Sequence, residues 1–403
     1  MNKAWRLTLV NNIPTHHQMP LARELHRILG DRFRCVFLSP VEAERSGMGW
    51  SDPSAGADDW VIRAWESPEA AENARRSALT ADAALLCTLW AYPPVPAWAR
   101  HRLADGLLTL GFSETRSKPS LRGRRFKDGR PAVGPRALLS LIGALRGQAR
   151  ERRTFASPMC HFLSIGAAAA VHEAARGNFG GRLWKYGYFT DVPDEAPAAR
   201  TGEDLRVLFA GRLLRWKRVE DLIRAAAILP SQAPRTHFTV IGDGSEKQAL
   251  LSLVGSLGLG GTVEFQPFLP AAQVREEMRR ADVLFLGSDD EEGWGAVVNE
   301  GMAEGCVPVV SSLCGAGTYL VHHERTGFKY DVGDVEGLAA ILARLAGDRE
   351  LVQRIGVQAW KYVNEEWSQR VAAERIVEFC GAGLEGGPLA RFESGPLSPA
   401  AKK

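Results

Sequence analysis

Short apolar runs alternate with amphipathic stretches along most of the chain, as in β-α-β units built around parallel sheets. Near the N-terminus the pattern predicts a strand at residues 6–10, a polar loop at 11–18, a helix at 21–29 and a strand at 35–38. Gly30 directly follows the predicted helix, where a glycine commonly ends one. The chain therefore begins as an α/β domain.

The alternation is most regular after residue 205. Strands are predicted at residues 206–209, 237–241, 263–265, 282–286 and 307–310, and helices at 219–229, 245–257, 271–280 and 297–304. Five strands joined by four crossover helices indicate a doubly wound, Rossmann-like domain. Later helices are predicted at residues 334–345, 351–363 and 369–379, the last capped by Ser368. Upstream, residues 84–90 and 107–112 are further strands, whereas the polar stretch 42–74 supports no assignment.

The length of 403 residues exceeds what one hydrophobic core usually supports, which is about 250–300 residues. We expect an N-terminal Rossmann-like domain over residues 1–189 and a linker at 190–204 that is rich in Pro, Ala and acidic residues. The second domain spans 205–380, with its last helix crossing back to the first domain. The Gly- and Pro-rich tail 381–403 is expected to be disordered.

The charge balance changes this picture little. A net charge of +3 is too small to indicate a nucleic-acid partner. The six cysteines form no CxxC pair, so the spacing of a zinc site is absent. No signal peptide is recognisable and no apolar run approaches the ~20 residues of a membrane helix. We therefore expect a cytoplasmic protein.

Basic residues concentrate in the segment 116–153. They are Arg116, Lys118, Arg122, Arg124, Arg125, Lys127, Arg130, Arg136, Arg146, Arg150, Arg152 and Arg153. An apolar stretch, 137–145, lies between them. Such a segment can rest on an anionic membrane surface, which would make the protein peripheral on the inner face of a membrane. A solvated surface loop and helix is the alternative.

Two carboxylates mark the strongest constellation. Glu292 lies in the loop after the predicted strand 282–286, and Glu300 lies about one turn into the following helix. Ligands of open parallel sheets bind at the carboxyl ends of strands. Gly293 and Gly295 allow the backbone to approach a ligand, and the helix N-terminus favours a phosphate. One loop can thus hold sugar, phosphate and ribose, although a surface pair of acids would give the same pattern.

Two further turns follow strands of the same domain. Gly211-Arg212 is followed five residues later by Lys217, and fixed cations at this edge would stabilise a departing diphosphate. The alternative is that Arg212 and Lys217 are ordinary charged residues of a surface loop. Gly242-Asp-Gly244 is only a GxG turn and lacks the full dinucleotide motif. It is interpreted mainly as turn geometry beside the nucleotide.

Taken together, these motifs resemble the retaining glycosyltransferases of family 4, which have the GT-B fold. The resemblance runs from about residue 205 to 379 and also includes Pro308-Val-Val310 and Gly333-Asp334. It implies two Rossmann-like domains that face a central cleft, with the nucleotide-sugar donor in the second domain and the acceptor in the first. It also implies a sugar transfer to a hydroxyl with retention, without a cofactor or metal.

Residue roles follow from the resemblance at matching positions. Arg212 and Lys217 correspond to the cations on the donor diphosphate, and Glu292 to the catalytic residue that faces the donor sugar. The remaining donor-binding positions are Gly211, Gly242, Gly293, Trp294, Gly295 and Glu300.

The N-terminal half matches less well, because the Gly-Gly pair that many members carry in the first loop is replaced by Asn11-Asn12. Candidate residues for the acceptor side of the cleft are His16, His17, Glu114 and His161.

Other functions stay open at this level. A nucleotide-sugar epimerase would share the donor site and need no acceptor. A phosphorylase would need a pyridoxal-phosphate lysine, for which the sequence offers no context. A non-catalytic scaffold would bind a partner through 116–153, yet would have no chemical need for Arg212, Lys217, Glu292 and Glu300 together. The preferred acceptor is a glycan or a lipid-linked glycan in surface polysaccharide or glycolipid synthesis.

Overall fold

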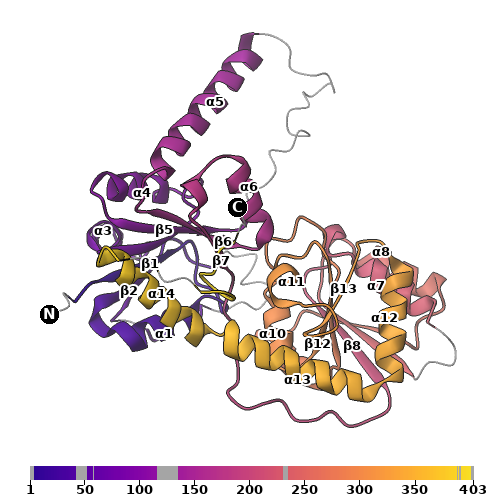
Figure 1. The fold of residues 1–403 in the computed structure, drawn as a ribbon. Helices are drawn as coiled ribbons and strands as arrows, with labels where there is room; N and C mark the ends of the chain where they lie inside the picture. Colours follow the sequence, from indigo (N-terminus) through magenta and orange to yellow (C-terminus); the bar gives the residue numbers. More distant parts are fainter. Residues whose placement is uncertain are drawn as a thin grey trace.

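The computed structural model describes residues 4–41, 52–57, 59–115, 135–229, 235–387, 389 and 392–400. Two α/β domains stand side by side and are joined by an irregular linker and by two long C-terminal helices (Figure 1). Both sheets are entirely parallel, as the β-α-β pattern of the sequence predicts.

The N-terminal domain is built on a seven-stranded sheet of order β3-β2-β1-β4-β5-β6-β7. Its strands are β1 (Leu7–Asn11), β2 (Phe33–Phe37), β3 (Val61–Arg63), β4 (Ala83–Cys87), β5 (Leu108–Ser113), β6 (Cys160–Ile165) and β7 (Leu183–Tyr186). Its helices are α1 (Met19–Leu29), η1 (Gly30–Arg32), α3 (Pro68–Thr80), α4 (Val95–Ala104), α5 (Pro135–Phe155), α6 (Ala167–Ala175) and η3 (Phe179–Gly181). The strand order reverses between β1 and β4.

The C-terminal domain carries a six-stranded sheet of order β10-β9-β8-β11-β12-β13. Its strands are β8 (Leu205–Ala210), β9 (Thr236–Ile241), β10 (Val263–Gln266), β11 (Val283–Leu286), β12 (Val307–Ser311) and β13 (Phe328–Tyr330). The helices are η4 (Arg215–Lys217), α7 (Val219–Ala227), α8 (Lys247–Ser256), α9 (Ala271–Arg280), α10 (Val297–Ala303), α11 (Gly315–Leu320), α12 (Val335–Gly347), α13 (Arg349–Glu366) and α14 (Gln369–Leu384). The sequence pattern missed β13, which is only three residues long.

The last helix returns to the first domain. α13 runs along the C-terminal domain, and α14 continues from it to lie against α1 (Figure 1). Ser368 starts α14 by accepting a hydrogen bond from the Val371 amide. The ring of Phe379 then packs edge-on against Trp184 with 5.1 Å between centroids. The chain therefore passes between the two domains twice, once through the linker before β8 and once at α14.

The tail departs from the expectation of disorder. Residues 392–400 pack on the edge strand β7, where the Leu397 amide donates to the Lys185 carbonyl and the Lys185 amide donates to Ser398, both at 2.8 Å. Leu397 is fully buried. A composition rich in Gly and Pro suggested a mobile tail, but backbone pairing with an open sheet edge needs few apolar side chains.

The structure describes only part of the basic segment. Residues 116–134, with seven of the predicted cations, lie outside the described residues, whereas 135–155 form α5, which projects away from the N-terminal domain (Figure 1). At its base Glu151 forms an ion pair with Arg176 at 3.0 Å. Among the residues that the structure describes, no helix is both long and apolar enough to cross a membrane.

Candidate active site

The predicted donor residues gather at one place in the C-terminal sheet. The strand order reverses between β8 and β11, which are neighbours with Val207 opposite Val283. Gly211 and Arg212 directly follow β8, and the loop that carries Glu292 follows β11. Crevices at such a reversal, outside the carboxyl ends of the strands, are where open α/β sheets bind ligands.

The turn after β8 is supported by the turn after β9. The Gly211 amide donates to the Ile241 carbonyl at 3.0 Å, and the Leu213 amide donates to Asp243 at 2.8 Å. A Cβ on Gly242 would collide with the carbonyl oxygen of Gly211. Gly242 thus has a steric reason to be glycine, and its backbone shapes the turn that presents Arg212. The Arg212 side chain is exposed and forms no ion pair with the residues that the structure describes.

Lys217 and Glu292 meet across this crevice. The ammonium of Lys217 forms a direct ion pair with Glu292, and both side chains are nearly buried. The Ser288 hydroxyl donates to the same carboxylate oxygen at 2.8 Å. The ring of Trp216 lies 4.4 Å from the Lys217 ammonium, close enough for a cation–π contact. The cation and the carboxylate predicted to face diphosphate and sugar are therefore held next to each other.

Glu300 lies in the first turn of α10 and reaches toward the other domain. Its carboxylate is 3.4 Å from Nε2 of His16, with 14% of the Glu300 side chain exposed. His16 belongs to the first loop of the N-terminal domain. The carboxylate predicted to bind a ribose thus lies at the boundary between the domains, and one of the two predicted histidines reaches it.

The side chain of Trp294 is fully buried, so only the backbone of this residue can meet a ligand. Its indole nitrogen donates to Oδ1 of Asn299 at 2.8 Å. The amide nitrogen of Asn299 in turn donates to the Tyr188 carbonyl at 3.1 Å, across the domain boundary. The ring also lies against Gly187, where a Cβ would collide with it. Trp294 therefore anchors the donor loop to the N-terminal domain.

Glu114 approaches the donor loop from the opposite side. It follows β5, and its carboxylate accepts a hydrogen bond from the Tyr188 hydroxyl at 2.9 Å. A Cβ on Gly293 would collide with that carboxylate. His17 packs its ring on Tyr188, with 4.4 Å between centroids. Glu114 and His16 thus meet Gly293 and Glu300 of the C-terminal domain, whereas the ring of His17 packs on Tyr188.

His161 lies elsewhere, and the expectation that it faces the cleft is wrong. Only 2% of the residue is exposed, and its Nδ1 accepts a hydrogen bond from the Trp184 indole at 3.1 Å. Its ring packs edge-on against Phe379 of α14. Burial, assisted by the charge of Arg182, lowers the pKa of His161 to about 4. His161 lies inside β6 and faces helix α14, which covers the sheet. The sequence did not reveal this because α14 comes about 200 residues after β6.

Three supporting residues escaped sequence analysis. Ser288 holds Glu292, Tyr188 holds Glu114, and Asn299 joins Trp294 to the other domain. A signal existed for Ser288, because it follows a buried strand at its carboxyl end. For Tyr188 and Asn299 the partners lie 74 and 111 residues away, so no local pattern could have identified them.

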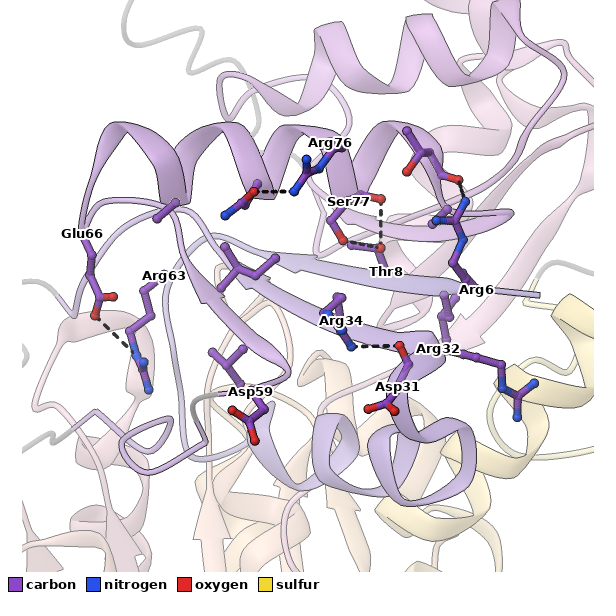
Figure 2. A pocket seen from close by; sticks show the side chains of 17 residues that line it. Arg6, Thr8, Asp31, Arg32, Arg34, Asp59, Arg63, Glu66, Arg76 and Ser77 are labelled. Carbon is purple, nitrogen blue, oxygen red and sulfur yellow. Dashed lines mark hydrogen bonds and ion pairs between the residues drawn. The ribbon is translucent and has the colours of Figure 1, made fainter. Parts of the chain in front are cut away.

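A groove in the N-terminal domain lacks the features of a site. It measures about 560 Å³ and lies between α3 and the strands β1 to β3 of the N-terminal domain (Figure 2). Its arginines do not converge: Arg63 turns to Glu66, Arg76 to Asn73, and Arg34 to the Asp31 carbonyl (Figure 2). Within the described ranges, no cluster of three or more His, Cys, Asp or Glu side chains could hold a metal ion.

Comparison with known proteins adds to this geometry. Residues 194–362 match the family model of glycosyl transferases group 1. The chain is 31% identical over 172 residues to the exopolysaccharide phosphotransferase SCO2592 of Streptomyces coelicolor, covering 43% of this chain and 18% of that protein. It is 30% identical over 181 residues to the amylovoran biosynthesis glycosyltransferase AmsK of Erwinia amylovora, covering 44% of each. The chain thus matches less than half the length of either relative.

The fold has a counterpart over nearly the whole chain. The crystal structure of Anabaena Alr3699/HepE in complex with UDP superposes with a TM-score of 0.64 and 15% identity, covering 93% of this chain and 98% of that one. At this identity the likeness shows the fold alone. Two facing Rossmann-like domains with a site at the carboxyl edge of the second sheet define the GT-B fold. Within that fold, the match to the glycosyl transferases group 1 model covers most of the second domain.

Proposed function

We propose that the protein transfers a sugar from a nucleoside-diphosphate sugar to a hydroxyl of a glycan or lipid-linked acceptor, as a retaining enzyme of glycosyltransferase family 4. One observation carries the proposal: Lys217 pairs with Glu292 at the strand-order reversal, and the same loop and helix meet the other domain where Glu300 pairs with His16 and Gly293 lies against Glu114. A cation for the diphosphate, a carboxylate for the sugar and one for the ribose are thereby combined.

The chemistry follows from these positions. As the bond between the anomeric carbon and the phosphate oxygen breaks, negative charge grows on the diphosphate, and Lys217 and Arg212 stabilise it. The ion pair between Glu292 and Lys217 must loosen when the donor binds, because the diphosphate competes for Lys217 and the sugar hydroxyls compete for Glu292. The departing phosphate oxygen takes the proton of the acceptor hydroxyl, so a separate base is not needed. Retention and independence from metals are parts of the proposal.

Similar proteins support the substrate class. HepE has been solved with UDP and with UDP-glucose, and AmsK is named for amylovoran biosynthesis. For this chain we therefore propose a nucleoside-diphosphate sugar as the donor. The proposed acceptor is an intermediate of surface polysaccharide or glycolipid synthesis. The Trp294–Asn299–Tyr188 chain of hydrogen bonds keeps the domains closed around the cleft, which excludes water that would otherwise hydrolyse the donor.

The test is turnover of a donor panel, with release of nucleoside diphosphate measured with and without glycan and lipid-linked acceptors, and with EDTA. We expect release that rises with an acceptor and persists in EDTA, and a product with the anomeric configuration of the donor by NMR. Formation of an isomer or free sugar without any acceptor would instead indicate an epimerase. Inversion at the anomeric carbon would refute retention, and loss of activity in EDTA would refute independence from metals.

The projecting helix α5 suggests how a lipid-linked acceptor is reached. Its exposed face carries Arg146, Arg150 and Arg153. We propose that the basic segment 116–153 contacts an anionic membrane surface. Co-sedimentation with vesicles of phosphatidylglycerol and phosphatidylcholine tests this. Binding that depends on phosphatidylglycerol and is lost when the segment's charges are neutralised is expected, and equal binding by the neutralised variant would overturn the proposal.

A further inference from the structure

The turn that carries Lys217 ends in an unusual conformation. Lys217 is the last residue of η4, and Arg218 follows it with φ 55° and ψ 36°. This left-handed region is uncommon for residues other than glycine because Cβ crowds the following carbonyl. Helix α7 begins at the next residue. The direction in which Lys217 leaves the turn therefore depends on Arg218 being held in a disfavoured conformation.

Asp221 supplies the holding contact. Its carboxylate accepts from the Arg218 guanidinium at 2.8 Å, and the residue is 1% exposed. The same carboxylate accepts from the Gly333 amide at 3.0 Å and from the Tyr330 hydroxyl at 3.3 Å. Since Tyr330 ends β13 and Gly333 follows it, Asp221 ties the turn to a rigid strand of the sheet. Glu220 adds a second ion pair to Arg218 at 2.9 Å.

A second contact fixes the other side of the turn. The carbonyl of Trp216 accepts a hydrogen bond from the Asp289 amide at 2.9 Å, in the loop that carries Glu292. The turn is thus fixed to the donor loop before Lys217 and to β13 after it. Lys217 lies between these two fixed points, and its ammonium pairs with Glu292.

We propose that Asp221 is a positioning residue for Lys217: by pairing with Arg218 it holds the left-handed residue that aims Lys217 at the donor diphosphate. The inference rests on the proposed function, because it needs a diphosphate at Lys217. Asp221 touches no ligand, since it is buried behind Arg218 and Tyr330. Its effect passes through the backbone of the turn.

The test separates conformation from charge at position 218. Arg218→Ala leaves a side chain that disfavours the left-handed region and has no ion pair, whereas Arg218→Gly adopts that region freely. We expect UDP, or whichever of GDP, ADP and dTDP the wild type binds best, to bind Arg218→Ala about tenfold more weakly. Arg218→Gly should bind it within about twofold of the wild type.

Asp221→Asn keeps the shape of the side chain but loses its charge. We expect about tenfold weaker binding of the same nucleotide, and recovery to near the wild-type value in the double variant Asp221→Asn/Arg218→Gly. Rescue by glycine is the readout that a general loss of stability would not produce. Full binding by Asp221→Asn, equal binding by Arg218→Ala and Arg218→Gly, or no rescue in the double variant would each overturn the proposal.

Asp282→Asn is the matched control. Asp282 is also buried, pairs with Arg349 at 2.7 Å and accepts a hydrogen bond from the Arg206 amide at 2.9 Å. It lies at the amino-terminal end of β11, whereas the donor loop follows the carboxyl end of that strand. Its variant should lose thermal stability and still bind the nucleotide. Failure of the wild type to bind any nucleoside diphosphate would refute the proposed function itself. Binding by the wild type with the wrong order among the variants would refute only the role of Asp221.

Discussion

The buried imidazole of His161 gives the protein a specific sensitivity to acid. Its Nδ1 accepts a hydrogen bond from the Trp184 indole N–H, so the folded state requires an unprotonated nitrogen at that position. Burial lowers the pKa of His161 to about 4, whereas an unfolded histidine titrates near ~6.5. Because the unfolded chain binds the proton more tightly, this contribution to stability is complete above pH ~6.5 and is lost as the pH falls toward 4.

The magnitude follows from the two pKa values. At pH 5 the unfolded histidine is almost fully protonated and the folded one is mostly neutral, which lowers the free energy of unfolding by about 2 kcal/mol relative to pH 8. For a domain of roughly 200 residues this corresponds to a Tm lower by roughly 4–8 °C. His161→Gln removes the titrating ring and keeps an acceptor for Trp184. Between pH 8 and pH 5, the Tm of this variant should therefore fall by roughly 4–8 °C less than the Tm of the wild type.

The assay is thermal unfolding from pH 8 to pH 5, with His101→Gln as the control because its imidazole is exposed on α4. We expect the control to follow the wild type. His161→Gln should also keep the donor KM, since this residue lies in the core rather than in the cleft. An unchanged pH dependence in His161→Gln would refute the burial argument. A loss of activity at unchanged Tm would return His161 to the active site.

Three other changes test separate parts of the structure. Ser288→Ala removes the hydroxyl that holds Glu292 and should lower kcat/KM about fivefold, as expected for ~1 kcal/mol, whereas Ser312→Ala, which removes an exposed hydroxyl that donates to Asp331, should not. Arg102→Met removes the donor to buried carbonyls at the end of α3 and at the start of β5, and should lower the free energy of unfolding in denaturant by about 3–5 kcal/mol; a change below ~1 kcal/mol would contradict this. Deleting residues 391–403 exposes the β7 edge and should cause aggregation in light scattering while donor binding persists; a fully monomeric variant would contradict the role of the tail.

The C-terminal domain could be predicted in detail because its chemistry is local. Glu292 and Glu300 lie within one strand–loop–helix unit, and Arg212 and Lys217 within another, so each pair is visible as a short motif. Parallel strands then bring the two loops together without further information. The ion pair between Lys217 and Glu292 spans 75 residues, yet it follows from the topology alone.

The N-terminal side was less predictable because its contacts are long-range. Glu114 follows β5 and His161 lies inside the neighbouring strand β6, yet sequence analysis gave both the same role; Glu114 faces Gly293 of the donor loop, whereas His161 faces the covering helix α14. The choice depends on which side of the sheet α14 returns to. Residues 392–400 show the same limit, since backbone pairing with β7 leaves no signature in composition.

We propose that the loops after β8 and β11 bind a nucleoside-diphosphate sugar. Calorimetric titration with UDP-, GDP-, ADP- and dTDP-sugars, using the wild type beside Lys217→Ala and Glu300→Ala, tests it most directly. We expect selective binding of one donor by the wild type and loss of that binding in both variants. Binding of no donor by the wild type, or unchanged binding in both variants, would contradict it and would favour a non-catalytic scaffold or a site elsewhere in the molecule.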